Sequence, residues 1–288
     1  GTFELGSEHA DAFKGQLFSF CNNMTSIDIP SGVTEIGKHA FLECTSLSSV
    51  TIPNTVTKLS GFQGCSSLPY ITIPNSVTEI GNSAFPSCNF ITIHLPSGLT
   101  KIGESAFSEC QNLTGITIPD KVSEIGGNAF YGCISLSSIN VPFGAYFSGE
   151  GVFRGCSALP SIDIPNSMSS IPNYTLYECT SLSSITIPDT VTSIGSHAFS
   201  DCNSLSSITI PNTVTSIGES AFGSCTSLSD VTIASTTKLD YTDSFDSIDS
   251  NAVLHVPREL VDAYKADSSW TNAFGGGIVA IGDTPTPL

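Results

Sequence analysis

Two consecutive stretches of this chain have almost the same sequence. Residues 183–205 read SSITIPDTVTSIGSHAFSDCNSL, and residues 206–228 read SSITIPNTVTSIGESAFGSCTSL. The shared pattern is I-x-I-P-x-x-V-T-x-I-G-x-x-A-F-x-x-C-x-x-L, with a period of 23 residues. A fixed period of this length is typical of a solenoid, because each unit is one coil that buries its apolar side only against its neighbours. The sequence therefore predicts stacked coils that share one continuous core.

One proline and one cysteine mark the register of each coil. The prolines are Pro30, Pro53, Pro74, Pro96, Pro119, Pro142, Pro165, Pro188 and Pro211. The cysteines are Cys21, Cys44, Cys65, Cys88, Cys110, Cys133, Cys156, Cys179, Cys202 and Cys225. Most steps are 23 residues, but the step from Cys44 to Cys65 is two residues shorter and the step from Pro74 to Pro96 is one shorter. Because the register is intact on both sides of each deletion, we expect both deletions at coil corners.

The segment I-x-I alternates apolar and polar residues, which predicts a strand with one buried face. In the coil of Pro188, Ile185 and Ile187 are expected to face the core and Thr186 to face outward. Proline has no N–H to donate to a strand ladder, so Pro188 is expected to end this strand.

The rest of the coil returns to the core twice. Val191 and Ile194 predict a second short strand, and Gly195 after it predicts a corner with positive φ or a close approach between coils. Phe199 and Cys202 are three residues apart, which places them on one face of a single helical turn.

The two ends of the chain depart from the repeat. Residues 1–16 match no repeat position, and we expect them to cap the first coil. The apolar residues suited to this role are Phe3, Leu5, Ala12 and Phe13. The solenoid is expected over residues 17–257, and residues 258–288 are expected to form a C-terminal helix-strand cap and a tail. We expect one structural domain overall.

The repeat resembles the BspA-like class of leucine-rich repeats, also called the Treponema pallidum type, over about residues 17–257. The I-P, I-G, A-F and Cys positions recur together, which makes the resemblance specific. It implies an α/β solenoid, a right-handed leucine-rich repeat superhelix of about ten to eleven coils. A parallel β-sheet is expected on its concave face, with short strands or helical turns on the other sides and a cap at each end.

The resemblance also implies a location and a class of partner. Proteins of this class are typically secreted or cell-surface proteins of host-associated bacteria or of trichomonad-like protists. They are linked to adhesion and to binding of host extracellular-matrix and plasma proteins. The resemblance carries over no catalytic motif, and we expect neither enzyme activity nor a cofactor.

The composition limits the partners further. The net charge is -17, from 9 basic and 26 acidic residues, so the surface repels phosphate backbones and anionic lipid headgroups. No apolar run approaches the ~20 residues that span a bilayer. We therefore expect no binding to nucleic acid and no insertion into a membrane. We also expect a monomer. Because the chain starts with Gly and not Met, we expect that a signal peptide has been removed.

The spacing of the ten cysteines argues against disulfides. One cysteine per coil at one repeat position predicts a ladder of like residues about 4.8 Å apart. Their Cβ vectors would run parallel, which leaves the Cβ atoms farther apart than the ~3.8 Å that a disulfide prefers. Buried free thiols that pack as small apolar groups are the favoured interpretation. No C-x-x-C pair or Cys-His cluster indicates a metal site.

The histidines and serines do not predict a catalytic site. His39 and His197 share one repeat slot, which we interpret as an exposed corner, and His94 and His255 lie at distant outward strand positions. No Ser-His-Asp triad can be assembled from local spacing.

An acidic run follows the last regular coil. Its aspartates, every three residues, are Asp240, Asp243, Asp246 and Asp249. They are one candidate calcium loop, but calcium loops more often place ligands two residues apart. A solvated acidic loop is the favoured interpretation.

The outward positions of the first strand are the best binding candidates. We select Tyr70, Thr72, Thr92, His94, Thr117, Asn140 and Asp163. Tyr70 and His94 interrupt a stripe of Ser and Thr in adjacent coils, beside the two deletions, and exposed aromatic groups on a rigid face are favoured anchors. We expect these two residues to be neighbours on one sheet, at a shallow depression. The alternative is that Ser and Thr are only soluble, strand-compatible filler.

Two further coils depart from the repeat and carry exposed-aromatic candidates. They are Phe143, Tyr146 and Phe147 in one coil and Tyr174 and Tyr177 in the next. Some of these rings are expected to refill the core, and any that stay exposed would form a second patch.

The sequence thus predicts a non-enzymatic recognition module of the cell surface or exterior that binds a host protein or glycan. The alternative is a passive structural spacer without its own ligand. Recognition requires a patch that departs from the repeat consensus, whereas a spacer would be uniform.

Overall fold

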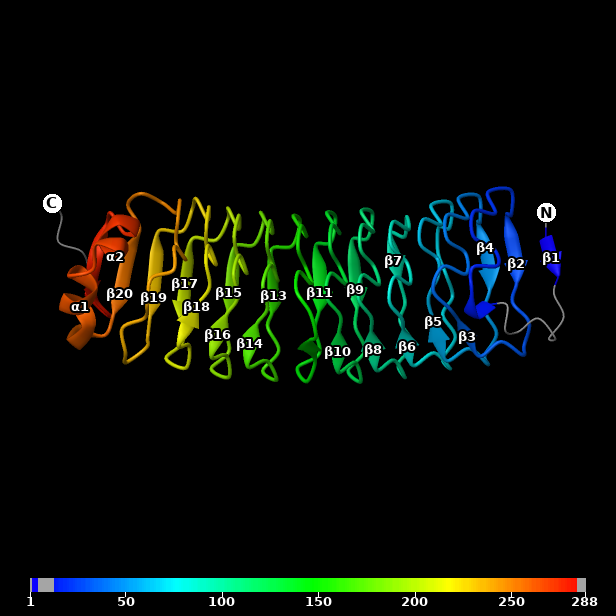
Figure 1. Cartoon of the computed structure of the whole chain (residues 1–288), viewed down its shortest axis with the longest axis horizontal. Coiled ribbons are helices and arrows are strands. Elements are labelled where there is room, and N and C mark those ends of the chain that lie inside the picture. The colour runs from blue at the N-terminus through cyan, green and yellow to red at the C-terminus, as the bar shows by residue number, and fades with distance from the viewer. Residues whose placement is uncertain (1, 5–12, 284–288) are drawn as a thin grey trace. The chain divides into compact units, whose positions relative to one another are not determined.

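The computed structural model describes residues 2–4 and 13–283 of this chain. It divides into two compact units, Gly1–Cys156 and Ser157–Leu288. Each unit is a stack of coils whose short strands run parallel to those of the next coil (Figure 1). The I-x-I segments form what we call front strands, and the V-T-x-I segments form side strands. Both units therefore have the leucine-rich repeat solenoid fold that the repeat predicts.

The front strands of the first unit form two separate ladders. The first contains β1 (Thr2–Glu4), β2 (Ser26–Asp28) and β4 (Ser49–Thr51), and the second contains β7 (Thr92–Ile93), β9 (Gly115–Thr117) and β11 (Ser138–Asn140). The prediction of one continuous sheet is wrong, because the coil between β4 and β7 contributes no front strand.

A proline explains one side of this interruption. In regular coils the residue two before the first Ile donates its N–H to the preceding coil, as Ser48 does to the carbonyl of Thr25 at 2.9 Å. Pro69 occupies this position and has no N–H. On the other side lies the one-residue deletion before Ile91. Within the described chain, residues 70–73 make no backbone hydrogen bond to either neighbouring coil.

The side strands of the first unit form one six-stranded sheet. They are β3 (Glu35–Ile36), β5 (Lys58–Leu59), β6 (Glu79–Ile80), β8 (Lys101–Ile102), β10 (Glu124–Ile125) and β12 (Tyr146–Phe147). Acidic and basic side chains alternate along this ladder, with Lys58 3.2 Å from Glu79 and Lys101 3.0 Å from Glu124. Opposite charges on directly paired residues favour this register over a slipped one.

The second unit repeats this arrangement. Its front ladders are β13 (Ser161–Asp163) with β15 (Ser184–Thr186), and β17 (Ser207–Ile210), β19 (Asp230–Ile233), β20 (Val253–Val256) and β21 (Gly277–Ala280). Its side ladder contains β14 (Ser170–Ile171), β16 (Ser193–Ile194) and β18 (Ser216–Ile217). Serine replaces the alternating charges at the outward side positions here.

The A-F-x-x-C segment forms consecutive tight turns and not the predicted helical turn. The N–H of Cys44 donates to the carbonyl of Phe41 at 3.1 Å, but Glu43 between them has a φ of 55° and His39 has a φ of 66°. Left-handed residues cannot continue a right-handed helix. They instead turn backbone groups toward the next coil, where the N–H of Glu43 donates to the carbonyl of Gln63 at 2.8 Å.

The recurrent glycine after the side strand is explained by close approach between coils. A Cβ on Gly195 would lie 2.6 Å from the backbone N of Asn173, and a Cβ on Gly218 would lie 2.5 Å from that of Ser196. Neither glycine has positive φ. Of the two predicted reasons for this glycine, the close approach is confirmed, and positive φ occurs two residues later.

The core of each unit contains a stack of phenylalanine rings. In the first unit Phe18, Phe41, Phe62, Phe85, Phe107, Phe130 and Phe153 follow one another at 4.9–5.6 Å between ring centroids. In the second unit Phe199, Phe222 and Phe245 are stacked at 5.1 Å, and a buried Leu176 occupies the same position in an earlier coil. Offset-stacked rings add to the apolar burial that joins coil to coil.

The first residues of the chain extend the stack at its beginning. Strand β1 pairs in parallel with β2, which the sequence did not predict. Phe13 is fully buried, with its ring 5.5 Å from Phe18. Leu5, Ala12 and the side chain of Phe3 lie outside the described residues.

The C-terminal segment follows β20. It contains a 3₁₀ helix η2 (Arg258–Leu260), α1 (Val261–Lys265), α2 (Ser268–Ala273) and strand β21, which pairs with β20. Trp270 is buried against Tyr264 at 4.9 Å and Phe245 at 6.0 Å. That the two ends act as caps, and that the chain is one domain, stay predictions.

Candidate binding groove

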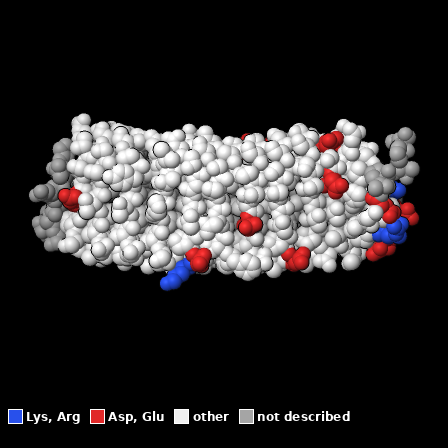
Figure 2. All heavy atoms as spheres, turned by 180° about the vertical axis from the view of Figure 1, so that it is seen from behind, with Lys and Arg blue, Asp and Glu red and all other residues white. Residues whose placement is uncertain are grey.

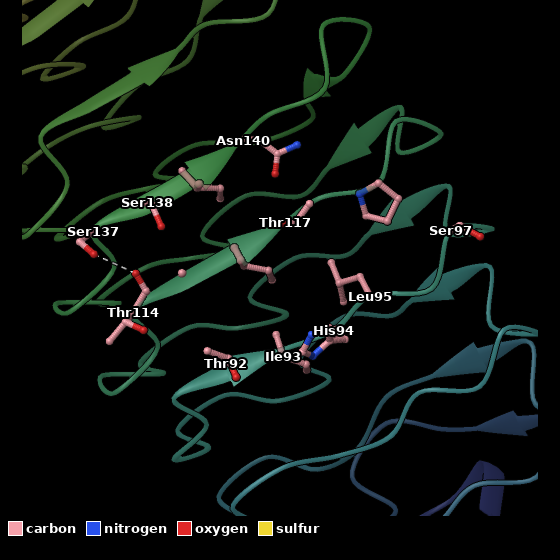
Figure 3. A pocket seen from close by; sticks show the side chains of 14 residues that line it. Thr92, Ile93, His94, Leu95, Ser97, Thr114, Thr117, Ser137, Ser138 and Asn140 are labelled. Atoms are coloured by element: carbon pink, nitrogen blue, oxygen red, sulfur yellow. Dashed lines mark hydrogen bonds between the residues drawn. The ribbon is translucent and has the colours of Figure 1, made fainter.

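A cavity of about 1100 Å³ lies on the outward side of β7, β9 and β11 in the first unit. We call it the front groove. It is lined by Thr92, Ile93, His94, Leu95, Ser97, Thr114, Gly115, Ile116, Thr117, Pro119, Ser137, Ser138, Ile139 and Asn140. Figure 3 shows these side chains projecting from three consecutive strands and from the turn that follows β7.

Gly115 hollows the floor of the front groove. It lies in register between Thr92 on β7 and Ser138 on β11. A Cβ at this position would lie only 2.7 Å from the hydroxyl oxygen of Ser138. The missing side chain therefore leaves a depression between two hydroxyl-bearing residues. The sequence contains a signal for this depression. The outward residue before the first strand isoleucine is serine in most coils, and it is glycine at position 115.

The front groove is uncharged. None of its lining residues is Asp, Glu, Lys or Arg, and His94 is its titratable side chain. Charge is also sparse over most of the face drawn in Figure 2, where isolated acidic groups and one basic side chain lie among uncharged residues and further charged groups gather at one end. A ligand in this groove would meet hydroxyl, imidazole and apolar groups.

Several polar groups of the groove are already used within the chain. The Asn140 side chain accepts the N–H of Ile118 at 2.9 Å and donates to the carbonyl of Ile118 at 3.1 Å. The hydroxyl of Ser137 donates to the carbonyl of Thr114 at 3.1 Å (Figure 3). Asn140 thus completes the end of β9 and has little hydrogen-bonding capacity left for a ligand.

Other polar groups remain available. Within the described chain, the side chains of Thr92, His94, Thr117 and Ser138 form no hydrogen bond to another residue, and Thr92, His94 and Thr117 are exposed. Ser138 is exposed as well. With Ser97, which is also exposed in the lining, the groove therefore offers four hydroxyls, each able to donate and accept, and one imidazole.

The structure brings together four of the seven binding candidates. Thr92, His94, Thr117 and Asn140 line the front groove, whereas Tyr70 and Thr72 lie one coil earlier and are not part of its lining. Asp163 is exposed on β13 of the second unit. Tyr70 is 68% exposed. The sequence did not single out Gly115, Leu95, Ser97 or Pro119.

The second set of aromatic residues divides between core and surface. Phe147 is buried with its ring 5.5 Å from Phe153, so it replaces the isoleucine of the repeat. Phe143 is 73% exposed and Tyr146 is 45% exposed. Phe143 lies directly after Pro142, at the repeat position that Ser97 occupies at the edge of the groove.

A separate ring cluster lies in the second unit. His197 stacks on Tyr174 at 5.0 Å, and the ring of Tyr177 meets His197 edge-on at 6.2 Å. All three are half-buried. The prediction that the slot of His197 and His39 is an exposed corner is therefore wrong, because both side chains are half-buried.

The ten cysteines are free thiols, all buried except Cys21, which is half-buried. The prediction of a buried cysteine ladder is confirmed, and its reduced state stays a prediction. Each thiol that donates a hydrogen bond does so to the core residue of the coil before, as Cys110 Sγ does to the carbonyl of Phe85 at 3.1 Å. Burial raises the pKa of Cys44 to about 11 and that of Cys110 to about 12. These groups are neutral and poorly nucleophilic at physiological pH.

The acidic run forms no metal cluster in the described part of the chain. No group of three or more His, Cys, Asp or Glu residues there is placed to hold a metal ion. Asp249 accepts the backbone N–H of Asn251 at 2.8 Å. Nor is any described helix long and apolar enough to cross a membrane.

Comparisons with known proteins place the repeat in a family. The model of the BspA type leucine rich repeat region matches in six copies, over residues 11–61, 60–159 and 148–259. No curated protein matches the chain.

Solved structures of bacterial repeat proteins are similar. A leucine-rich repeat protein from Eubacterium ventriosum is 23% identical, with 82% of this chain and 66% of that chain covered and a TM-score of 0.52. A leucine rich cell surface protein from Faecalibacterium prausnitzii is 30% identical, with 76% and 82% covered and a TM-score of 0.47. A leucine-rich repeat protein from Bacteroides ovatus is 26% identical, with 92% of this chain and 85% of that chain covered and a TM-score of 0.41. The family match extends over most of the repeat region, so this chain belongs to the BspA type leucine-rich repeat family.

Proposed function

We propose that this chain is a recognition module of the cell surface or exterior that holds a host protein or glycan in its front groove. As a BspA type repeat chain it is a protein-interaction module, and the family is generally a non-enzymatic scaffold. Adhesion to a host molecule is the finer proposal, together with secretion and action as a monomer.

The observation that carries the proposal is the departure of the groove from the repeat consensus. Gly115 and His94 replace the serine and threonine that occupy these positions in regular coils. A rigid ladder of paired strands holds the groove open, so little ordering free energy is lost on binding. A passive spacer would require none of these departures.

A binding screen tests this proposal. The full chain is immobilised and exposed to host extracellular-matrix and plasma glycoproteins, and bound protein is measured by surface plasmon resonance. Gly115→Val, which fills the floor of the groove, should weaken binding at least tenfold. Ser161→Val, at the same repeat position on β13, should leave binding unchanged. Equal affinity of the two variants would move the site away from the front groove, and no binding at all would favour the spacer.

A further inference from the structure

One exposed aromatic ring lies in the coil before the front groove, and another lies in the coil of β11, the last coil of the groove. Tyr70 stands one coil before β7, at the repeat position of Thr92, and is 68% exposed. Phe143 follows β11 in the coil at the other end and is 73% exposed. Three coil spacings separate the coil of Tyr70 from that of Phe143, which is about 14 Å, and Phe143 lies five repeat positions later in its coil than Tyr70 does. Rings at the two ends of a shallow floor are platforms on which the flat faces of a ligand can stack.

The polar groups between these rings suit a ligand that carries hydroxyls. The hydroxyls of Thr92, Thr117 and Ser138 have no partner within the described chain, and each can both donate and accept. A sugar hydroxyl has the same dual capacity, so the groove and a sugar can satisfy one another in several orientations. The apolar parts of Leu95 and Pro119 complete the lining beside the C–H faces of such a ligand.

The charges of the chain disfavour ionic ligands in the front groove. The chain has a net charge of -17, and the groove contains no Lys or Arg to pair with an anionic group. It also contains no Asp or Glu to pair with a cationic one. Sulfated, sialylated and strongly charged peptide ligands would therefore lose hydration without gaining a partner.

The floor also disfavours an extended peptide. Strand β9, in the middle of the floor, is paired on both sides, with β7 and with β11, so a peptide could add as a strand only at the outer edges of this ladder and not along the floor. The shallow hollow at Gly115 provides no deep pocket for a large side chain, which peptide recognition uses as an anchor.

From these features we infer that the front groove binds an uncharged oligosaccharide, stacked at its ends on Tyr70 and Phe143 and hydrogen-bonded between them by Thr92, Thr117 and Ser138. The inference rests on the proposed function, because it names the class of ligand for the same groove. The recognised host molecule is then bound through a neutral glycan and not through its polypeptide.

Neutral oligosaccharides serve as the probes. Hexasaccharides of β-1,4-linked glucose, α-1,4-linked glucose and β-1,4-linked mannose, and an array of neutral host glycans, are tested on the full chain by saturation-transfer NMR. A heparin hexasaccharide and sialylated glycans are the charged comparators. At least one neutral glycan should bind, and the charged ones should bind at least tenfold more weakly. If no neutral glycan binds, or if the charged glycans bind as tightly as the neutral ones, the inference is wrong.

Variants of the flanking rings locate the site. Tyr70→Ala and Phe143→Ala should each weaken glycan binding about tenfold, which is about 1.4 kcal/mol. Phe20→Ala removes a ring that is 63% exposed elsewhere in the first unit and should change nothing. Unchanged binding in both ring variants, with melting temperatures intact, would contradict the stacking geometry.

Enzymatic deglycosylation separates this inference from the proposed function. A host glycoprotein that binds the chain is compared before and after its glycans are removed. Loss of binding is the expected result. Retained binding that still depends on Gly115 would overturn the glycan inference while leaving the recognition role of the groove intact.

Discussion

In most regular coils the carbonyl oxygen of the core phenylalanine accepts one hydrogen bond from its own coil and one from the next coil. For Phe85 these are the N–H of Cys88 at 3.2 Å and the Sγ of Cys110 at 3.1 Å. A cysteine at this position combines a small apolar volume with a weak donor, whereas alanine has no donor and serine is more costly to bury. The repeated spacing predicts the buried ladder, but it does not reveal these bonds, because they depend on the turn that ends at each cysteine.

A count of reactive thiols tests the ladder. Denatured protein that has not been reduced should react with about ten equivalents of a thiol reagent, because all ten cysteines are free. Native protein should react slowly and first at the half-buried Cys21. Fewer than about eight thiols in the denatured, unreduced chain would show that bridges form.

The buried thiols also predict a loss of stability at alkaline pH. Burial raises the pKa of Cys44 to about 11 and of Cys65 to about 12, from an ordinary value of 9.0. The unfolded chain ionises first, so this contribution is complete below pH 9 and decreases as pH rises through the folded pKa values. Between pH 9 and its folded pKa, each such thiol lowers the free energy of unfolding by up to about 1.4 kcal/mol per pH unit.

Urea denaturation at about pH 8 and pH 10.5 measures this effect. The free energy of unfolding should be clearly lower at the higher pH. Cys110→Ala removes one thiol whose pKa burial raises to about 12. The free energy of unfolding of this variant should therefore depend less steeply on pH. An identical dependence in this variant would assign the loss to groups other than the thiols.

At the scale of elements, single residues decide where the front ladders end. Ser137 donates its backbone N–H to the carbonyl of Thr114 at 2.9 Å, which helps to join β11 to β9. Pro69 stands at the same repeat position and begins a coil without a front strand. Ser137→Pro should therefore break the β9–β11 ladder and destabilise the first unit by about 1–3 kcal/mol.

Hydrogen exchange provides the matched test of the same argument. Residues 70–73 should exchange rapidly in the natural sequence, because their amides lack backbone partners. Pro69→Ser restores a donor and should slow exchange in this segment. If exchange stays equally rapid, the deletion before Ile91 would be sufficient to keep the ladder open.

The sequence predicts the strands more completely than it predicts the site. Period-two alternation predicts the front strands, because the alternation of buried residues such as Ile208 with exposed neighbours is a local pattern. It does not predict the alternating ladder that contains Lys58 and Glu124, which requires the register between coils. Four of the groove residues were predicted as outward positions, but the hollow itself arises from Gly115 lying between Thr92 and Ser138, a relation that only pairing reveals.

At the scale of the whole molecule, the C-terminal segment should protect the last coil. The ring of Trp270 packs on Phe245, the Tyr264 hydroxyl accepts the N–H of Leu239 at 3.0 Å, and Lys238 pairs with Asp267 at 2.7 Å. Removal of residues 258–288 would expose this apolar end and should cause fraying or aggregation. Removal of residues 284–288 alone is the control, with no expected change. Light scattering and thermal melting distinguish the results, and a monomeric, equally stable long truncation would disprove the cap.

The central claim, that recognition occurs in the front groove, is tested most directly by histidine footprinting. His94 is exposed in the groove, whereas His197 and His255 are half-buried in the second unit. The chain is treated with diethyl pyrocarbonate, with and without a saturating amount of the glycan or glycoprotein found to bind, and modified peptides are quantified by mass spectrometry. We predict that the bound ligand lowers modification of His94 at least fivefold and leaves His197 and His255 unchanged. Unchanged modification of His94 at saturation would contradict the account.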